Sequence, residues 1–209
     1  KGESLFKMGR IKDSLEILSD AEKSAKNSPE LNSARCFWTG RGLFELNKNE
    51  AALPYFYKSA EILKNAGLEK TSVYSQAILY SGKTLVRLKN FEAAADCFEY
   101  AVQNGKKFSA GEYEEACVNF FENCVLAGNF KKCEEYFVQL EKLGQIEKFV
   151  FSQEAKYRIL LAYGQALENL GKFSACYDCY VKVLTEGPFV LPPLQCKKRI
   201  FFLVPIKIK

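Results

Sequence analysis

The chain has 209 residues, of which 48% are hydrophobic, 26% charged and 14% aromatic, a composition that excludes a disordered or fibrous chain. The formal net charge is +5, but five basic residues after Pro188 account for all of it, so residues 1–187 carry 25 basic and 25 acidic side chains. This neutral body argues against nucleic-acid binding, and the absence of histidine excludes the commonest general base and the commonest zinc ligand.

The eight cysteines are scattered along the chain, which is not the dense disulfide framework of a small secreted domain. We therefore expect reduced thiols, a cytoplasmic location and no bound metal or cofactor. The first residue is Lys1 and not methionine, which indicates a piece of a longer protein. Because no apolar run approaches the roughly 20 residues of a membrane span, we expect neither a signal peptide nor a membrane segment.

The chain contains five copies of one pattern, whose second halves begin 38, 42, 39 and 43 residues apart, at Ile11, Asn49, Phe91, Phe130 and Phe173. Each half carries apolar residues at helical spacing, so each copy predicts an antiparallel helix pair. The first helices are expected at about residues 2–9, 30–47, 69–88, 110–127 and 152–170. The second helices are expected at about residues 11–26, 49–65, 90–104, 129–143 and 172–186.

Two prolines and a set of glycines refine this map. Pro29 is suited to open the first helix of the second pair, whereas Pro54 is expected to delay or bend the second helix of that pair. Three copies place a glycine in the first helix and an aromatic residue in the second, which predicts a close approach of small against large. These residues are Gly40 with Phe56, Gly82 with Phe98, and Gly164 with Tyr180.

This pattern resembles the tetratricopeptide repeat (TPR) over roughly residues 2–187. Ile78, Gly82, Leu85, Ala94, Phe98 and Ala101 carry the best match, followed by Gly164, Leu167, Cys176, Tyr180 and Val183. The period of 38–43 residues exceeds the usual ~34, as in the long-repeat branch that includes kinesin light chain. The resemblance implies an all-α fold, a right-handed α-solenoid of about five helix pairs, occupying residues 1–187 as one repeat domain.

Residues 188–209 form a separate tail that contains four prolines and the strand-like apolar run Ile200 to Val204. Two interpretations are open for this tail. It either packs on the last helix pair, or it adds to a partner as an edge strand or anchor.

The resemblance also places ligands along a concave groove lined by the first helices. Its inward polar positions correspond to Arg41, Glu45, Lys83, Arg87, Glu122, Gln165 and Glu168. Arg41, Lys83 and Arg87 would form a basic stripe able to pair with an acidic or phosphorylated peptide. The aromatic residues nearby, which would supply contact area, are Phe37, Trp38, Phe44 and Tyr80. The alternative is that these aromatic residues belong to the core and that the basic residues form a solvated face balanced by Glu45.

Two other motifs are interpreted as structural. Cys176 and Cys179 form a Cys-x-x-Cys inside a second helix, where Cys176 takes the small-residue position of Ala94, so we expect packing and neither redox nor zinc chemistry. The Lys and Asn clamp that TPR domains use for chaperone C-termini is not reproduced, so chaperone binding is not expected.

The predicted function is therefore non-enzymatic. We expect a scaffold or adaptor that binds a peptide or helix of a protein partner in the groove, within a larger assembly and without nucleic acid. A purely architectural segment, or a module that regulates an enzyme elsewhere in the chain, remains the alternative. The resemblance to TPR proteins favours a cytoskeletal or ciliary setting within the cytoplasm.

Overall fold

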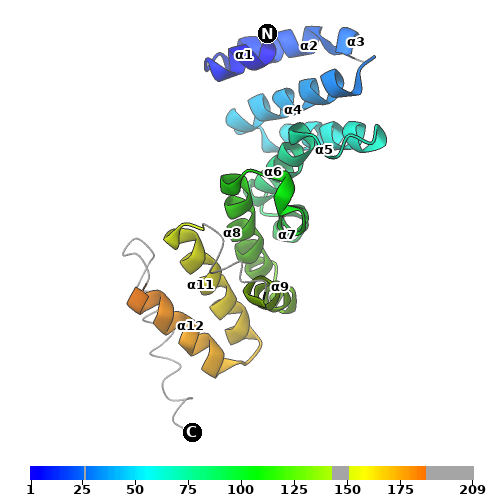
Figure 1. The fold of residues 1–209 in the computed structure, drawn as a ribbon. Coiled ribbons are helices and arrows are strands. Elements are labelled where there is room, and N and C mark those ends of the chain that lie inside the picture. The colour runs from blue at the N-terminus through cyan, green and yellow to red at the C-terminus, as the bar shows by residue number, and fades with distance from the viewer. Residues whose placement is uncertain (26, 143–150, 187–209) are drawn as a thin grey trace. The chain divides into compact units, whose positions relative to one another are not determined.

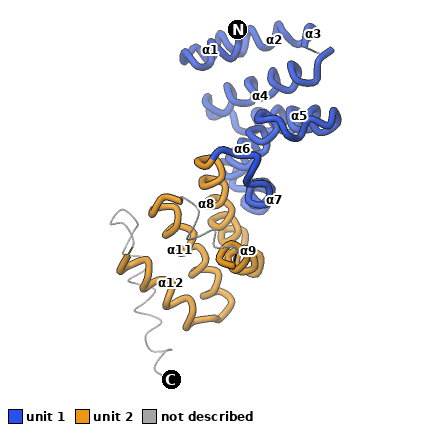
Figure 2. Tube along the Cα trace, in the orientation of Figure 1, with its two compact units in different colours: residues 1–109 blue, residues 110–209 orange. Residues whose placement is uncertain are grey.

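The computed structural model describes all residues except 26, 143–150 and 187–209. The described residues form α-helices and one 3-10 turn and include no strand, which confirms the expected all-α fold. They divide into two compact units, residues 1–109 and 110–209, which Figure 2 colours separately. The expectations for the tail at 188–209 lie outside the described residues.

Unit 1 is built from three antiparallel helix pairs (Figure 1). The first is α1 (Gly2–Lys7) with α2 (Ile11–Asp20), followed by the single turn α3 (Glu22–Ala25). The second is α4 (Pro29–Glu45) with α5 (Asn49–Asn65), and the third is α6 (Ser72–Arg87) with α7 (Phe91–Gln103). The 3-10 turn η1 (Gly105–Lys107) closes the unit.

Unit 2 contains two further pairs of the same kind. They are α8 (Ala110–Leu126) with α9 (Phe130–Lys142), and α11 (Gln153–Asn169) with α12 (Phe173–Glu186). The described residues thus hold the five predicted pairs.

The turn inside every pair has the same backbone geometry. The residue two positions before each second helix has a positive φ, at Gly9, Asn47, Lys89, Gly128 and Gly171. In the third pair, the Lys89 amide donates to the Val86 carbonyl at 3.0 Å and the Asn90 amide to the Leu85 carbonyl at 2.9 Å. This left-handed C-terminal cap satisfies the last carbonyls of the first helix and reverses the chain, which explains why so short a linker suffices.

The glycine and aromatic contacts are present as expected. A methyl group placed on Gly40 would lie 2.9 Å from Cε1 of Phe56, and one on Gly82 would lie 2.8 Å from Cζ of Phe98. In the last pair, the corresponding distance from Gly164 to Cε1 of Tyr180 is 2.7 Å. All three rings are fully buried, so each glycine supplies the space that its partner ring fills.

The pair α8–α9 departs from this rule because Phe121 stands where the other copies have glycine. The rings of Phe121 and Phe137 meet edge to face with centroids 6.2 Å apart. Phe137 also stacks on Tyr163 of α11, at 3.7 Å between centroids and 8° between planes. Phe137, the counterpart of the rings that contact glycine in other pairs, therefore contacts a ring of its own pair and a ring of the next pair.

Two details of the sequence map are corrected. The single helix expected over residues 11–26 is broken at Ala21 into α2 and α3, where the Ser24 hydroxyl donates to the Ala21 carbonyl at 3.0 Å. Pro54 does not delay α5, which begins at Asn49 and continues through the proline. Pro29 does open α4, behind an N-cap from Ser28 whose hydroxyl accepts from the Leu31 amide at 3.3 Å.

Candidate functional site

The first helices of unit 1 place rings and cations on one face. Trp38 and Arg41 of α4 recur 42 residues later as Tyr80 and Lys83 of α6, and helical spacing puts each ring beside the cation one turn further on. Trp38 and Tyr80 are half-buried, whereas Phe37 and Phe44 are buried in the core. Of the four aromatic residues predicted to supply contact area, two therefore belong to the core and two reach the surface.

Arg41 lies among three aromatic rings. Its Cζ is 4.1 Å from the ring centre of Tyr80, 5.0 Å from Phe6 of α1 and 5.8 Å from Trp38. Its Nε atom is buried without a hydrogen-bond partner, and its Nη2 lies 3.6 Å from a carboxylate oxygen of Glu45. Cation–π contacts gain strength when the cation is desolvated. Arg41 therefore links α1, α4 and α6 through these ring contacts, while its charge stays close to the surface.

Arg87 has a different role from the one its register suggests. Its Nη1 donates to the Phe44 carbonyl at 2.8 Å and to Oδ1 of Asn47 at 3.4 Å, and its Cζ lies 3.4 Å from the ring centre of Phe44. The side chain therefore caps the C-terminal end of α4, where carbonyl groups lack helical partners. Arg87 is a link between neighbouring pairs.

Lys83 lies one turn before Arg87 on the same helix. Its Nζ is 4.8 Å from the ring centre of Tyr80, and the side chain is partly exposed. Together with Arg41, Lys83 makes a cationic and aromatic face on α4 and α6, which we call the unit 1 face and which comprises Trp38, Arg41, Tyr80 and Lys83.

Two of the three predicted site residues of unit 2, Glu122 and Glu168, bond within the chain through their side chains. Glu122 of α8 accepts two hydrogen bonds from Arg158 of α11, each at 2.8 Å, and these bonds raise the pKa of the Arg158 guanidinium. Glu168 accepts from the Tyr180 hydroxyl at 2.7 Å. Gln165 lies half-buried on α11, two turns beyond Arg158.

Arg158 is not among the predicted site residues, because it does not occupy a repeat position that matches them. The partner of Glu122 comes from an earlier turn of the next first helix, at a position for which the repeat alignment gives no signal.

The first helices of unit 2 also border a cavity of about 220 Å³ with acidic walls. Glu114, Glu115 and Glu154 line it, together with Ser152 and the single basic residue Arg158. The Ser152 amide and hydroxyl donate to the Glu114 carboxylate at 2.6 and 2.9 Å. Glu114 thus places a negative charge at the N-terminus of α11, where the helix dipole favours it. Among these first helices, α6 of unit 1 carries only basic charged residues and α8 of unit 2 only acidic ones, whereas acidic and basic residues balance in α4 and α11.

The cysteines in the described residues are structural. Cys176 is fully buried and its thiol donates to the Phe173 carbonyl at 3.3 Å, which agrees with a packing role for the Cys-x-x-Cys. Burial raises the pKa of Cys97, Cys117 and Cys179 to about 12, so these thiols stay protonated and unreactive near neutral pH. No group of three or more potential metal-ligating side chains occurs among the residues the structure describes.

We expect these thiols to make the fold sensitive to alkali. An unfolded cysteine loses its proton near its ordinary pKa of 9.0, whereas Cys97, Cys117 and Cys179 keep theirs to about 12 in the folded chain. Above pH 9 the unfolded state therefore binds fewer protons, and the free energy of unfolding falls as the pH rises toward 12. Urea titrations at pH 8, 9, 10 and 11 measure this fall. Replacing the three cysteines by alanine should flatten the curve, and an equally steep fall in that variant would contradict the assignment.

None of the described helices is both long enough and apolar enough to cross a membrane.

Comparison with known proteins gives a structural likeness alone. No protein-family model matches the chain, and no curated protein matches it. Its fold is similar to crystal structures of a Podosopora anserina protein described as a kinesin light chain with nearly identical TPR-like repeats. One, a single-residue variant, is 10% identical with a TM-score of 0.64, covering 87% of this chain and 89% of its own. The other is 9% identical with a TM-score of 0.63, covering 99% of this chain and 92% of its own. The helix pairs, their glycine and aromatic contacts and this likeness together establish that the chain has a TPR-like helical-repeat fold.

Proposed function

We propose that this chain is a non-enzymatic scaffold or adaptor that binds a peptide or helix of a partner protein on the first-helix surface of its repeats. The observation that carries the proposal is the unit 1 face, where two cations lie within 5 Å of the ring centre of one half-buried tyrosine, Tyr80. Large rings beside charged groups are the composition of interface hot spots. The TPR-like fold supports the same function, because stacked helix pairs expose long surfaces suited to extended partners.

The expected partner segment for unit 1 is acidic or phosphorylated. Lys83 and Arg41 supply positive charge, and the rings exclude water around it, which strengthens pairing with an incoming carboxylate or phosphate. The description of the similar structures as kinesin light chain is compatible with a cytoplasmic, cytoskeletal location, which we include in the proposal.

The test uses the full chain with Lys83 replaced by glutamate. Lys83 is partly exposed and contacts the ring of Tyr80, so its reversal removes charge from the face with little cost in stability. We expect quantitative affinity purification from the native cell to recover the acidic partner about tenfold less well, a loss that grows as salt is lowered. The matched control is Lys58→Glu, an exposed lysine of the second helix α5, which should leave recovery unchanged.

A purely architectural role is the competing function, and one set of contacts favours it. Arg87 and Glu122, two of the predicted groove residues, bond to neighbouring pairs of their own unit. Equal recovery of all partners by the Lys83→Glu and Lys58→Glu chains would contradict groove binding and support the architectural role.

A further inference from the structure

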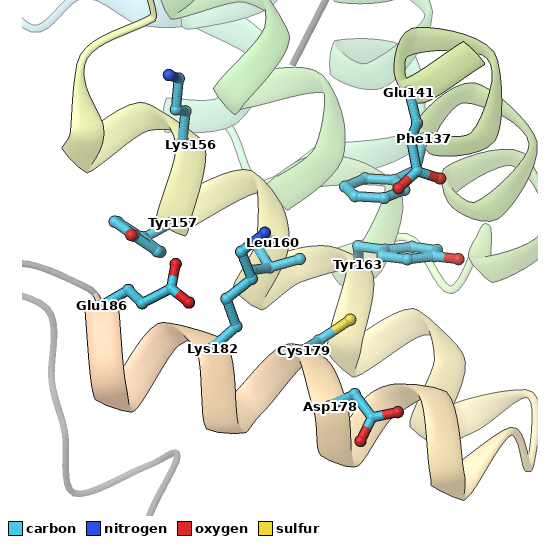
Figure 3. Close-up of a pocket in the computed structure, with 10 residues that line it drawn as sticks. All are labelled: Phe137, Glu141, Lys156, Tyr157, Leu160, Tyr163, Asp178, Cys179, Lys182 and Glu186. Atoms are coloured by element: carbon cyan, nitrogen blue, oxygen red, sulfur yellow. The ribbon is translucent and has the colours of Figure 1, made fainter. Parts of the chain in front are cut away.

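Unit 2 contains a second, larger cavity that the groove does not include. It has a volume of about 690 Å³, within the range of sites that take a small ligand or a few side chains, and lies between α9, α11 and α12 (Figure 3). The stacked rings of Phe137 and Tyr163 form one wall, with Leu160 and Cys179 nearby. Burial raises the pKa of Tyr163 to about 12, so this wall stays uncharged.

The polar groups of the chain already occupy one end of the cavity. There the ring of Tyr157 lies beside the carboxylate of Glu186, and burial together with Glu186 raises the pKa of Tyr157. Lys156 lies at the same end, and Asp178, which also lines the cavity, already has an interaction partner. These groups therefore call for no further occupant.

The ring wall is the part of the cavity that is open to an occupant. Leu160 and Tyr163 are only half-buried, and Glu141 is exposed beside the rings, at the end opposite Glu186 in Figure 3. Lys182 lines the cavity between the two ends and disfavours a cation there. An occupant with apolar side chains for the wall and a basic group for Glu141 fits this arrangement.

The wall results from the departure of α8–α9 from the glycine rule. Phe121 takes the position of the glycine in other pairs, so the ring of Phe137 has no glycine to pack against and stacks on Tyr163 of α11. The ring pair thereby presents apolar area beside α12 that a further apolar segment would remove from water.

The chain that follows α12 contains a segment of the required chemistry. Glu186 is the last residue of α12 and lines the cavity, so the chain continues from the cavity's own rim. The apolar run Ile200 to Val204 begins 14 residues later, directly after the basic residues 197–199. Fourteen extended residues span up to about 45 Å, whereas the return along α12 to Cys179 covers about 10 Å. The apolar residues 189–191 are nearer to α12 but have no adjacent basic residue for Glu141.

Charge favours unit 2 as the place where this segment binds. The described residues of unit 2 carry 11 acidic and 7 basic side chains, whereas those of unit 1 carry 13 acidic and 16 basic ones. Residues 187–209 carry five basic side chains and no acidic one. The helices of unit 2 therefore attract this segment, and those of unit 1 repel it.

We propose that residues 197–204 dock in the cavity of the same molecule. The apolar run Ile200 to Val204 packs on Phe137, Leu160 and Tyr163, and the basic residues before it lie against Glu141. The segment covers apolar area of the last helix pair, which in a repeat protein has no following pair to do so. The inference does not rest on the groove proposal, because the unit 1 face contributes no residue to this cavity.

The test measures fluorescence anisotropy of a fluorescein-labelled peptide of residues 197–205 added to the full chain. The tail variant, Phe201→Ala with Phe202→Ala, removes the chain's own competitor, which otherwise acts at an effective concentration of about 1 mM. We expect saturable binding to the tail variant and about tenfold weaker binding to the unaltered chain, as for a peptide with a Kd of about 0.1 mM. The Lys83→Glu chain should bind as the unaltered chain does, so failure of the groove proposal leaves this result intact.

Two further changes, made in the tail variant, locate the site. Leu160→Glu places a charge on the ring wall and should abolish binding, with circular dichroism to verify that the chain folds. Glu141→Lys changes an exposed position and should weaken the peptide severalfold, most strongly at low salt. The matched control is Glu135→Lys, an exposed position of α9 outside the lining of the cavity, which should leave binding unchanged.

Three results would overturn the proposal. The first is equal affinity of the tail variant and the unaltered chain, or no saturable binding by the tail variant. The second is an equal loss in Glu135→Lys and Glu141→Lys, which would show unspecific charge attraction. The third comes from sedimentation velocity: an unaltered chain that dimerises where the tail variant stays monomeric would replace docking within one molecule by docking on a second copy.

Discussion

Replacing Phe56 by alanine is expected to lower the free energy of unfolding of unit 1 by about 3–5 kcal/mol. The ring is fully buried and lies against Gly40, with ring centroids 6.0 Å from Phe37 and 5.6 Å from Tyr80. Its removal empties a space bordered by α4 and α6 together, and the glycine has no side chain with which to fill it. Trp38 is the only tryptophan of the chain and lies in unit 1, so its fluorescence in a urea titration measures this loss.

The control for Phe56 is its neighbour Tyr57, which lies on the same helix and is 46% exposed. Tyr57→Ala removes an aromatic ring of similar size from the surface, so we expect a change within about 0.5 kcal/mol. Similar losses for the two variants would show that the contact with Gly40 is not what holds the pair together.

Gly82→Ala is expected to lower the free energy of unfolding by about 1–2 kcal/mol, although alanine is the better helix former. The new Cβ would lie 2.8 Å from Cζ and 2.9 Å from Cε1 of Phe98, a fully buried ring. Overpacking costs about 1–3 kcal/mol, which exceeds the gain in helix propensity of up to about 1 kcal/mol. The same fluorescence-monitored urea titration measures the result.

A double-mutant cycle identifies the cause of the Gly82 effect. Phe98→Leu removes the atoms nearest the new methyl group, so Gly82→Ala should cost less in the Phe98→Leu background than in the unaltered chain. Gly111→Ala is the matched control, because Gly111 is helical and a Cβ there would meet nothing within 4 Å. Since Gly111 lies in unit 2, its urea titration is followed by circular dichroism. Additive effects of Gly82→Ala and Phe98→Leu would contradict direct contact.

The repeat register was readable from the sequence because it rests on local rules. Gly82 and Phe98 mark the contact within a pair, and the polar turn at Lys89 and Asn90 marks the reversal between its helices. Each of these signals depends on residues within about one repeat of each other, and the same signals recur in several copies. Recurrence is what separates a repeat from chance spacing.

The roles of the predicted groove residues could not be read in this way. Arg87 and Glu45 occupy the same register position of successive copies, yet Arg87 caps α4 while Glu45 pairs with Arg41 on its own helix. Glu122 bonds to Arg158, whose position has no counterpart in the groove pattern. A register position fixes which side of a helix a residue occupies, but not which neighbour a long side chain reaches.

By itself the sequence determined that this protein is a series of antiparallel helix pairs, because apolar periodicity, capping and small-against-large contacts act over short stretches of chain. Only the tertiary structure decided which cations link neighbouring helix pairs and which cations remain on an exposed face. It also decided where unit 2 holds an open cavity. Those outcomes depend on side chains from three helices meeting in space.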